Sequence, residues 1–590
     1  MMKVRTRKNA RMKAKPAAVA AIVISVVIVA IIMVAVIFTN CGGDGGKGGD
    51  GNQIVLSTIS DPKSFNPITS TETSTSEYTS IMYEGLLRRN GVTLEMEPNI
   101  AERWETSDDG LTWTFFIRSG VQWSDGASLS AYDVEFTFND LIYNTDIVPN
   151  SSRDTFSPEG KQFIVKALDS ARVEFTLPFP FAPFLHSMGT EILPKHKLAN
   201  VVAQKAFNTA LSINTPPKDM VVNGPFLLDS YLSSQKVVFK KNPLYWRKDA
   251  DGKSLPYLDR LVYMVVADQN AQKLTFLRGE TDYLAAKGED FPELKKAETA
   301  SGAFTVHRLG PNAGSSFAVF NQNMTIDEKT NRTYVDSVKL SWFRNDDFRR
   351  AVAHIIDKEN MISIAMNGLG YPQVSPMTPG EGYFYNGDVP TYPYDRQKAM
   401  SILEKEGFKR GTDGLLRDKK GNVVEFSFVT NSGNNVRLKI AEIIRKDLQE
   451  LGMKVHFQAL EFNALIQKLD NPPFDWDCVL LGLTGGDEPH FGRNVWHSGG
   501  QLHMWYPRQK TPSTPWEARI DTIYNLGARE LDRTKRKELY DEWQRIAADK
   551  QPFIYTVLSE KIECISNKFG NVTPSMSSGL LHNIEMLYVK

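Results

Sequence analysis

An apolar run of 22 residues, Ala17 to Phe38, divides this chain into a short leader and a long remainder. Only Ser25 interrupts the run, and seven Lys and Arg side chains precede it within residues 1–16. A basic leader followed by an apolar stretch is typical of an export signal, and this run is also long enough to span a bilayer core of roughly 30 Å. Both alternatives leave the cations inside and the remainder outside the membrane. We therefore expect the folded part of the protein to be exported.

Cys41 lies between the apolar run and a stretch in which seven of the ten residues from Gly42 to Gly51 are Gly. Such a composition behaves as a flexible coil. A cysteine at this position resembles the lipid-modified first residue of a bacterial lipoprotein, although Phe38 and Asn40 replace the usual Leu and small residue. We predict that Cys41 is lipidated and anchors the protein to a membrane, with a retained N-terminal helix as the alternative anchor.

The remaining composition narrows the class of protein. A chain of 590 residues exceeds the roughly 250 to 300 residues that one hydrophobic core usually serves, so at least two lobes are expected. Its 69 basic and 69 acidic side chains cancel, and they give no reason to expect a nucleic-acid partner. With only three cysteines, a disulfide-stapled domain is excluded, and Cys478 and Cys564 are expected to be small buried side chains.

Short strands dominate the pattern up to about residue 310, and helices dominate it from about residue 345. Alternation over residues 111–118 predicts a half-buried strand, and Ser130 with Asp133 has the spacing of a capping box at the start of a helix. In the second half, Asp346 or Asp347 is expected to cap a helix with one apolar face.

A long helix with an apolar stripe ends at Gly452 and is followed at once by the predicted strand Lys454–Ala459. Strand, helix and strand with short connections are typical of an α/β fold. After a last helix capped by Thr534, the apolar strand 552–557 is expected to pair with the first half of the chain. The chain would then leave one lobe, build a second and return, with a hinged ligand cleft between the two lobes.

The clearest motif runs from Glu97 to Gly126, through Ile-Ala-Glu-Arg-Trp-Glu, Asp-Gly-Leu-Thr and Gly-Val-Gln-Trp-Ser-Asp-Gly. Shorter motifs occur before it, at residues 83–86, and after it, at residues 131–134, 223–226, 256–260, 277–282, 320–321, 348–353 and 447–452. In this order they resemble family 5 of the bacterial extracellular solute-binding proteins, which are the oligopeptide-, dipeptide- and nickel-binding receptors of ABC importers. The resemblance covers the chain from about residue 54 to its end.

This resemblance implies a two-lobed α/β fold like that of the periplasmic binding proteins, with an extra subdomain in the first lobe. The expected division is a signal peptide or anchor (1–40), a tether (41–53), lobe I (54–314) with a subdomain at about 70–215, lobe II (315–545) and a return to lobe I (546–590). The implied function is that of a monomeric receptor without cofactor, which captures peptides or peptide-like solutes and delivers them to an ABC permease. It would work on the periplasmic or outer side of a membrane.

The resemblance also implies candidate ligand-binding residues. In peptide-binding relatives an Asp after an apolar strand pairs with the ligand amine, and Asp487 is the nearest acid here, shifted by one place in its loop. That shift puts a free-amine dipeptide in doubt, and a turn-capping role for Asp487 is the alternative. The other candidates are Ser70, Thr71, Thr73, Asn321, Asn431, Asn434, Thr484, Gly485, Trp496 and Trp505. For Trp496 and Trp505, an ordinary place in the core is the alternative.

Two other functions stay open. His490, His497 and His503 lie near Asp487 and Glu488, so a receptor for nickel or another metal complex is the first alternative. Their spacings of seven and six residues fit no usual metal motif, and no metal ligand is assigned. A secreted hydrolase is a remote alternative, because the chain has no Walker loop, no H-E-x-x-H helix and no G-x-S-x-G elbow. We therefore expect a protein that is not an enzyme.

Overall fold

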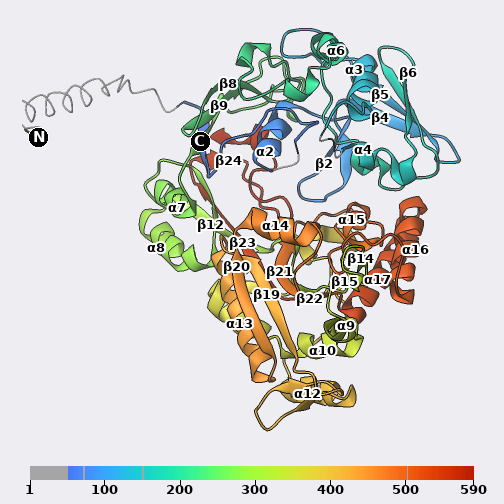
Figure 1. Cartoon of the computed structure of the whole chain (residues 1–590). Coiled ribbons are helices and arrows are strands. Elements are labelled where there is room, and N and C mark those ends of the chain that lie inside the picture. The colour runs from blue at the N-terminus through green and yellow to red at the C-terminus, as the bar shows by residue number, and fades with distance from the viewer. Residues whose placement is uncertain (1–50, 71–72, 149, 151, 501) are drawn as a thin grey trace, which may run out of the picture. The chain divides into compact units, whose positions relative to one another are not determined.

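A computed structural model describes residues 51–70, 73–148, 150, 152–500 and 502–590. The basic leader, the apolar run and Cys41 lie outside the described residues, so the predictions made for them stay predictions. None of the helices in the described part has the length and apolar character needed to cross a membrane. The compact unit Asn52–Lys590 carries all the elements described below (Figure 1).

Three sheets build the part of the molecule that we call lobe I. The first has the order β1 (Gln53–Thr58), β10 (Arg260–Val265), β9 (Lys236–Lys241) and β8 (Phe226–Leu232). Helix α2 (Thr73–Met82) packs against it, with the Tyr78 ring 5.0 Å from that of Tyr263. The second is the antiparallel sheet β4 (Ala101–Thr106), β5 (Thr112–Ile117), β7 (Arg172–Thr176) and β6 (Ile164–Ala167).

The predicted signals in the second sheet and its helix are confirmed. Strand β5 alternates between half-buried and buried residues, as the pattern over residues 111–118 indicates. Ser130 and Asp133 form the capping box at the start of α3 (Ala131–Phe136), which contacts β6 and β7. The helix then widens into a π-helical turn over Thr137–Ile142.

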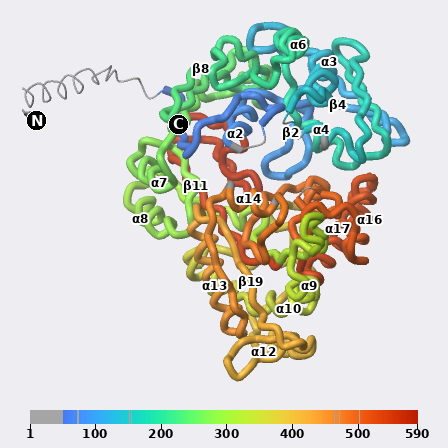
Figure 2. The backbone as a smooth tube through the Cα atoms, viewed as in Figure 1, coloured from blue at the N-terminus to red at the C-terminus, as the bar shows by residue number. Residues whose placement is uncertain are grey.

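The third sheet joins the end of the chain to its first half. It has the order β11 (Tyr283–Ala286), β23 (Val557–Ser566) and β12 (Phe304–Pro311), and β16 (Gly370–Pro372) pairs with the start of β23. Helices α7 (Gln269–Leu277) and α8 (Phe291–Ser301) pack beside it. The end of the chain returns to lobe I through β23, but the strand predicted at 552–557 does not make that contact, because β22 (Phe553–Tyr555) pairs with β13 (Ser315–Phe320) of the other lobe. Figure 2 shows the red C-terminal segment running back among the earlier elements of this lobe.

The second lobe, lobe II, is built on one five-stranded sheet. Its order is β20 (Lys454–Leu460), β19 (Glu425–Asn431), β21 (Cys478–Leu483), β13 (Ser315–Phe320) and β22 (Phe553–Tyr555). Strands β20, β19 and β21 are parallel to one another, whereas β13 runs antiparallel to β21, with Ser315 opposite Leu483. The carboxyl ends of the parallel strands and the start of β13 therefore share one edge of the sheet.

Helices cover this sheet on both sides. The helices of lobe II are α9 (Ser337–Phe343), α10 (Asp346–Ile355), α11 (Lys358–Met366), α12 (Arg396–Lys405), α13 (Asn435–Glu450), α14 (Phe462–Asp470), α15 (Arg493–Trp496), α16 (Pro515–Arg529) and α17 (Arg533–Lys550). Because successive strand residues point to opposite faces, Ala318 and Phe320 join one core while Phe317 and Val319 join the other. Cys478 is buried in the sheet, as predicted, and Cys564 is buried in lobe I.

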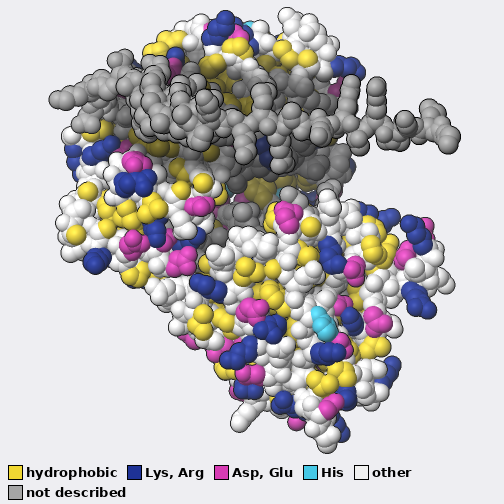
Figure 3. All heavy atoms as spheres, turned by 60° about the vertical axis from the view of Figure 1, so that its left-hand side comes forward, with side chains coloured by type: hydrophobic (Ala, Val, Ile, Leu, Met, Phe, Trp, Pro, Cys, Tyr) yellow, Lys and Arg dark blue, Asp and Glu magenta, His cyan; other side chains and the backbone are white. Residues whose placement is uncertain are grey.

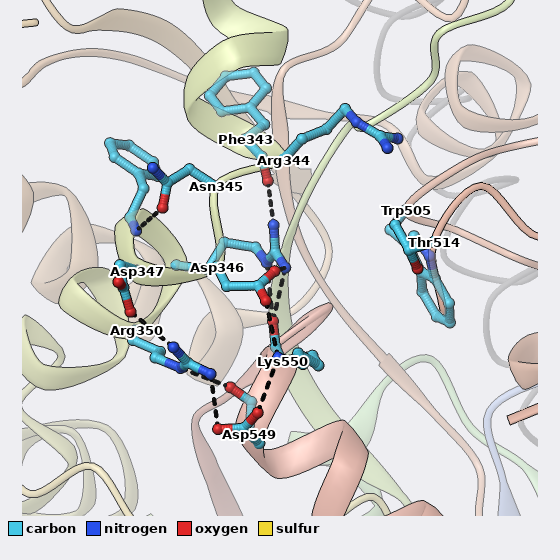
Figure 4. A network of polar contacts seen from close by, with 12 residues as sticks. Phe343, Arg344, Asn345, Asp346, Asp347, Arg350, Trp505, Thr514, Asp549 and Lys550 are labelled. Carbon is cyan, nitrogen blue, oxygen red and sulfur yellow. Dashed lines mark hydrogen bonds and ion pairs between the residues drawn. The ribbon is translucent and has the colours of Figure 1, made fainter. Parts of the chain in front are cut away.

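Two predicted helix caps are wrong by one or two positions. Asn345, and not Asp346 or Asp347, caps α10, and its side chain accepts the N–H of Phe348 at 3.0 Å. The two aspartates instead bind cations, because Arg350 joins Asp347 to Asp549 at 2.7 Å each (Figure 4).

At the other end of this network, Lys550 lies 3.1 Å from Asp346, and it ends helix α17. That helix begins after Asp532, whose carboxylate accepts the N–H groups of Thr534 and Lys535. The predicted cap Thr534 is therefore not the cap; its N–H donates to the capping residue, Asp532.

On the face that Figure 3 shows, basic and acidic side chains are interspersed and no large patch of one sign forms.

Candidate functional site

The chain crosses between the lobes at two adjacent places, both at the shared edge of the lobe II sheet. One crossing lies between β12 and β13 and the other between β22 and β23. Thr556 donates its N–H to the carbonyl oxygen of Ser316 at 2.8 Å, and the two hydroxyl groups lie 2.7 Å apart. Gly314, with φ of 100°, has no room for a side chain because Cβ would collide with the carbonyl oxygen of Leu483. The crossings are thus tied to each other beside the ends of β13 and β21.

Two cavities lie between the lobes on either side of Asp487. A cavity of about 830 Å³ is lined by the segment around β2 (Leu87–Arg89) of lobe I and by Asp487 and Phe491 of lobe II. A cavity of about 790 Å³ lies beyond it and is rich in aromatic side chains from both lobes, including Trp104, Trp113, Phe184, Tyr383 and Phe384. Asp487 and His186 line both cavities. The predicted cleft therefore has two compartments that meet at Asp487, and the second is rich in aromatic side chains.

Asp487 already has two partners, and both come from the opposite lobe. Its Oδ1 forms an ion pair with the guanidinium of Arg89 and lies 3.2 Å from Nε2 of His186, on α5 (Phe184–Ser187). The His186 ring meets the edge of Phe491 at 5.8 Å. Burial alone would raise the pKa of Asp487, but the hydrogen bond from His186 and the charge of Arg89 hold it below its usual value. Asp487 is therefore an ionised carboxylate that bridges the cleft.

The loop before Asp487 is held by a buried carboxyl group. Thr484 and Gly485 are exposed, and a side chain at Gly485 would collide with the carboxyl group of Glu381. Glu381 accepts the N–H of Gly314 at 3.1 Å and that of Thr378 at 2.7 Å. Burial raises the pKa of Glu381 to about 7. One carboxyl group thus contacts both the crossing at Gly314 and the loop that precedes Asp487.

A third cavity, of about 380 Å³, lies at the start of helix α13. Asn434 caps this helix by accepting the N–H of Arg437 at 2.9 Å, and Asn431 accepts a bond from the Arg437 guanidinium at 2.6 Å. In the part of the chain that the structure describes, no carboxylate forms an ion pair with Arg437, and burial lowers its pKa. Asn431 and Asn434 therefore position a cation that forms no ion pair with a carboxylate of the described residues.

Sequence reasoning missed Arg89, His186 and Arg437. For Arg437 a signal existed, because a cation in the first turn of a helix opposes the helix dipole and calls for another explanation. No comparable signal marked Arg89 or His186, since each meets Asp487 only through the packing of distant segments.

The prediction that Asn321 contacts ligand is wrong. Its side chain is fully buried and donates to the carbonyl oxygens of Phe474 at 3.2 Å and Trp476 at 3.0 Å. Its amide oxygen accepts the N–H of Asn323 at 3.1 Å. Because all of these polar groups are bonded inside lobe II, Asn321 holds a loop in place.

The prediction that Trp496 and Trp505 wall a ligand pocket is also wrong. Their relative exposures are 6% and 0%, and their ring centroids lie 5.5 Å apart in the core of lobe II. The Trp505 indole donates to Glu517 at 3.0 Å, and Thr514, which Figure 4 also labels, donates to the same carboxylate at 3.1 Å. Both aromatic side chains stabilise the interior, which is the alternative that their sequence context left open.

The candidates before α2 stay predictions. Ser70 is half-buried and immediately precedes two residues that lie outside the described part, one of which is Thr71. Thr73 is the first residue of α2. The side chains of Thr71 and Thr73 lie outside the described part, so the ligand contacts predicted for these residues and for Ser70 stay untested.

The three histidines of the metal alternative have different partners. Burial lowers the pKa of His490 to about 4, while His503 donates from Nδ1 to the carbonyl oxygen of Val495 at 3.0 Å. His497 lies 3.9 Å from Asp521. Within the described residues, no group of three or more His, Cys, Asp or Glu side chains could hold a metal ion.

The sequence and the fold both match known proteins. The model of the bacterial extracellular solute-binding proteins, family 5 Middle, matches residues 95–502. A probable ABC transporter-binding protein of Deinococcus radiodurans is 31% identical over 521 residues, which cover 84% of this chain and 85% of that protein. The oligopeptide-binding protein AppA of Bacillus subtilis is 26% identical over 527 residues, which cover 86% and 87% of the two chains.

Solved structures share the fold. The structure of AppA from Bacillus subtilis in complex with a nonapeptide has a TM-score of 0.71 at 24% identity and covers 92% of this chain and 99% of that one. NikA from Brucella suis in complex with Fe(III)-EDTA has a TM-score of 0.75 at 19% identity, with 91% and 100% covered. With two lobes, a cleft and an α/β topology in common with these receptors, this chain belongs to family 5 of the bacterial extracellular solute-binding proteins.

Proposed function

We propose that this chain is the substrate-binding receptor of an ABC importer and that it captures peptides or peptide-like solutes between its lobes. The observation that carries the proposal is the pair of cavities that meet at Asp487, with walls from both lobes. Names of relatives support the ligand class, since the family includes the oligopeptide-binding protein AppA and a dipeptide-binding protein of Escherichia coli that is 24% identical over 559 residues.

Each compartment suits one part of such a ligand. The exposed backbone at Thr484 and Gly485 offers hydrogen-bonding groups to a peptide backbone, beside the shared edge of the sheet. The aromatic cavity suits apolar side chains of varied shape, because ring faces make tolerant contacts. Arg437, held by Asn431 and Asn434, suits the ligand carboxylate, since no protein carboxylate in the described part neutralises it.

The location and the division of the chain belong to the same proposal. Lipidation of Cys41, or a retained N-terminal helix, would keep the receptor on the outer side of the membrane beside its permease. The expected boundary near residue 314 lies at the crossing between β12 and β13, whereas the crossing between β22 and β23 follows Tyr555 and therefore lies after the expected boundary at residue 545. A receptor that must release its ligand intact has no need of a nucleophile, so we propose no enzymatic activity.

Native mass spectrometry of the detergent-solubilised full chain, purified without refolding, tests the proposal. We expect a co-purified peptide or peptide-like solute, displaced by a random pentapeptide pool that also raises the melting temperature. A protein that carries no such ligand, and whose melting temperature does not change with any peptide pool, would contradict the proposed ligand class.

A further inference from the structure

Arg89 stands at the end of the short strand β2 and reaches across the cleft to Asp487. Among the described residues, Asp487 is the carboxylate with which Arg89 forms its ion pair. The Asp487 side chain is only 10% exposed, whereas that of Arg89 is 38% exposed. The carboxylate is therefore the buried partner, and closing the cleft without a cation beside it would leave a buried charge unbalanced.

The neighbouring arginine shows that this contact is specific to one position. Arg88 is bound within lobe I, 2.9 Å from Glu585 and 3.5 Å from Glu97. Arg88 lines the same cavity, but its ion pairs are with these two carboxylates, whereas that of Arg89 is with Asp487. One arginine of the pair stabilises its own lobe, and the other balances a charge on the opposite lobe.

His186 adds a second group from lobe I at the same oxygen atom, 3.2 Å from Oδ1 of Asp487. With Arg89 and His186 in place, Asp487 has its hydrogen bonds and its counter-charge before any ligand enters. A ligand ammonium group at this point would place two cations against one carboxylate, and it would have to displace Arg89 to bind.

We infer that Arg89 is a specificity-determining residue, which takes the place of a ligand ammonium at Asp487, so that the receptor selects ligands with no positive charge at that end. This inference rests on the proposed function and deepens it, because it assigns the ligand class to peptides with a blocked or otherwise uncharged amino end. It also gives a physical reason for the departure of this loop from the family pattern, since the carboxylate here serves the protein itself.

The test compares two random pentapeptide pools, one with free amino ends and one with acetylated ends, by competition calorimetry on the detergent-solubilised full chain. We expect the wild-type receptor to bind the acetylated pool at least tenfold more tightly. Arg89→Met keeps an unbranched apolar stem but removes the charge, so we expect the ratio of the two affinities to shift at least tenfold toward the free-amine pool.

Arg172→Met is the control, because it removes an arginine charge that pairs with Asp169 at 2.8 Å within lobe I and lies outside both cavities, and it should leave the ratio unchanged. In the double variant Arg89→Met/Asp487→Asn, the ratio should fall close to one. A wild-type receptor that prefers free amines, or an Arg89→Met variant that weakens both pools equally, would overturn the inference and leave the proposed function standing. If neither pool binds to any variant, the proposed ligand class fails, and the inference fails with it.

Discussion

At the scale of single residues, Glu517 shows how lobe II holds a charge in its interior. This carboxylate is 2% exposed and accepts bonds from the Trp505 indole at 3.0 Å and from the N–H of Ser513 at 2.7 Å. Burial would raise its pKa, but the His503 ring, 3.8 Å from Oε1, and the bonds from Trp505 and Ser513 lower the pKa to about 2. The ionised form therefore stabilises the fold, and it fixes the aromatic core beside it.

We expect Glu517→Gln to lower the free energy of unfolding by about 3 kcal/mol at pH 7, the value of a shift from an ordinary pKa near 4.5. Because the folded-state pKa is depressed, this difference is present above pH 4.5 and is lost as the pH falls toward 2. Urea denaturation of both proteins at pH 7 and pH 3 measures it. The exposed Glu538→Gln serves as the control, and a difference independent of pH would contradict the assignment.

At the scale of elements, helix α13 joins a structural role to a functional one. Asn434 begins the helix as its cap, and the same turn carries Arg437 toward the third cavity. The sequence predicted Asn434 as a ligand contact, whereas in the structure its side-chain oxygen accepts a hydrogen bond from the N–H of Arg437. In the proposed ligand site, Asn434 would act by positioning Arg437.

We expect Asn434→Ala to lower the free energy of unfolding by about 1 kcal/mol, because the cap of a helix is lost. Asn434→Asp should retain the cap and the stability, and the two variants are compared by urea denaturation at neutral pH. Equal stability of Asn434→Ala and the wild type would show that the cap contributes nothing to the fold.

Most element types followed from the sequence, and their exact starts did not. The strand at residues 111–118, the stop at Gly452 and the strand after it all depend on local spacing, which the chain displays directly. The cap of α10 could not be read from local spacing, because Asp347 binds Arg350 instead of capping the helix. Arg350 also binds Asp549, which lies far along the chain. The residues next to Asp347 in the sequence do not reveal this ion-pair network.

At the scale of the whole receptor, the two lobes contact each other directly beside the cleft. The N–H of Ala182 in lobe I donates to the carbonyl oxygen of Ala528 in lobe II at 2.7 Å. Two exposed ion pairs lie nearby, Arg529 with Glu159 and Arg533 with Glu95, both at 2.7 Å. Contacts of this kind favour a closed arrangement.

We expect Arg529→Ala/Arg533→Ala to open the ligand-free receptor, with a larger radius of gyration in X-ray scattering. Exposed pairs are weak, so the affinity for a bound peptide pool should fall by only about two- to fivefold. Arg519→Ala is the control, because Arg519 pairs with Glu542 inside lobe II. An unchanged radius of gyration at low salt, where such pairs are strongest, would contradict a role for these contacts in closure.

The sequence by itself determined the α/β organisation, the return of the chain to its first lobe, the family and the loop that carries Asp487. These depend on hydrophobic periods, turn residues and the order of motifs, all of which are properties of neighbouring residues. Only the tertiary structure decided that Asn321, Trp496 and Trp505 belong to the interior, because the exposure of a side chain depends on the distant segments that pack against it. It also decided the partner of Asp487, because Arg89 stands 398 positions away and meets it only when two lobes fold and close.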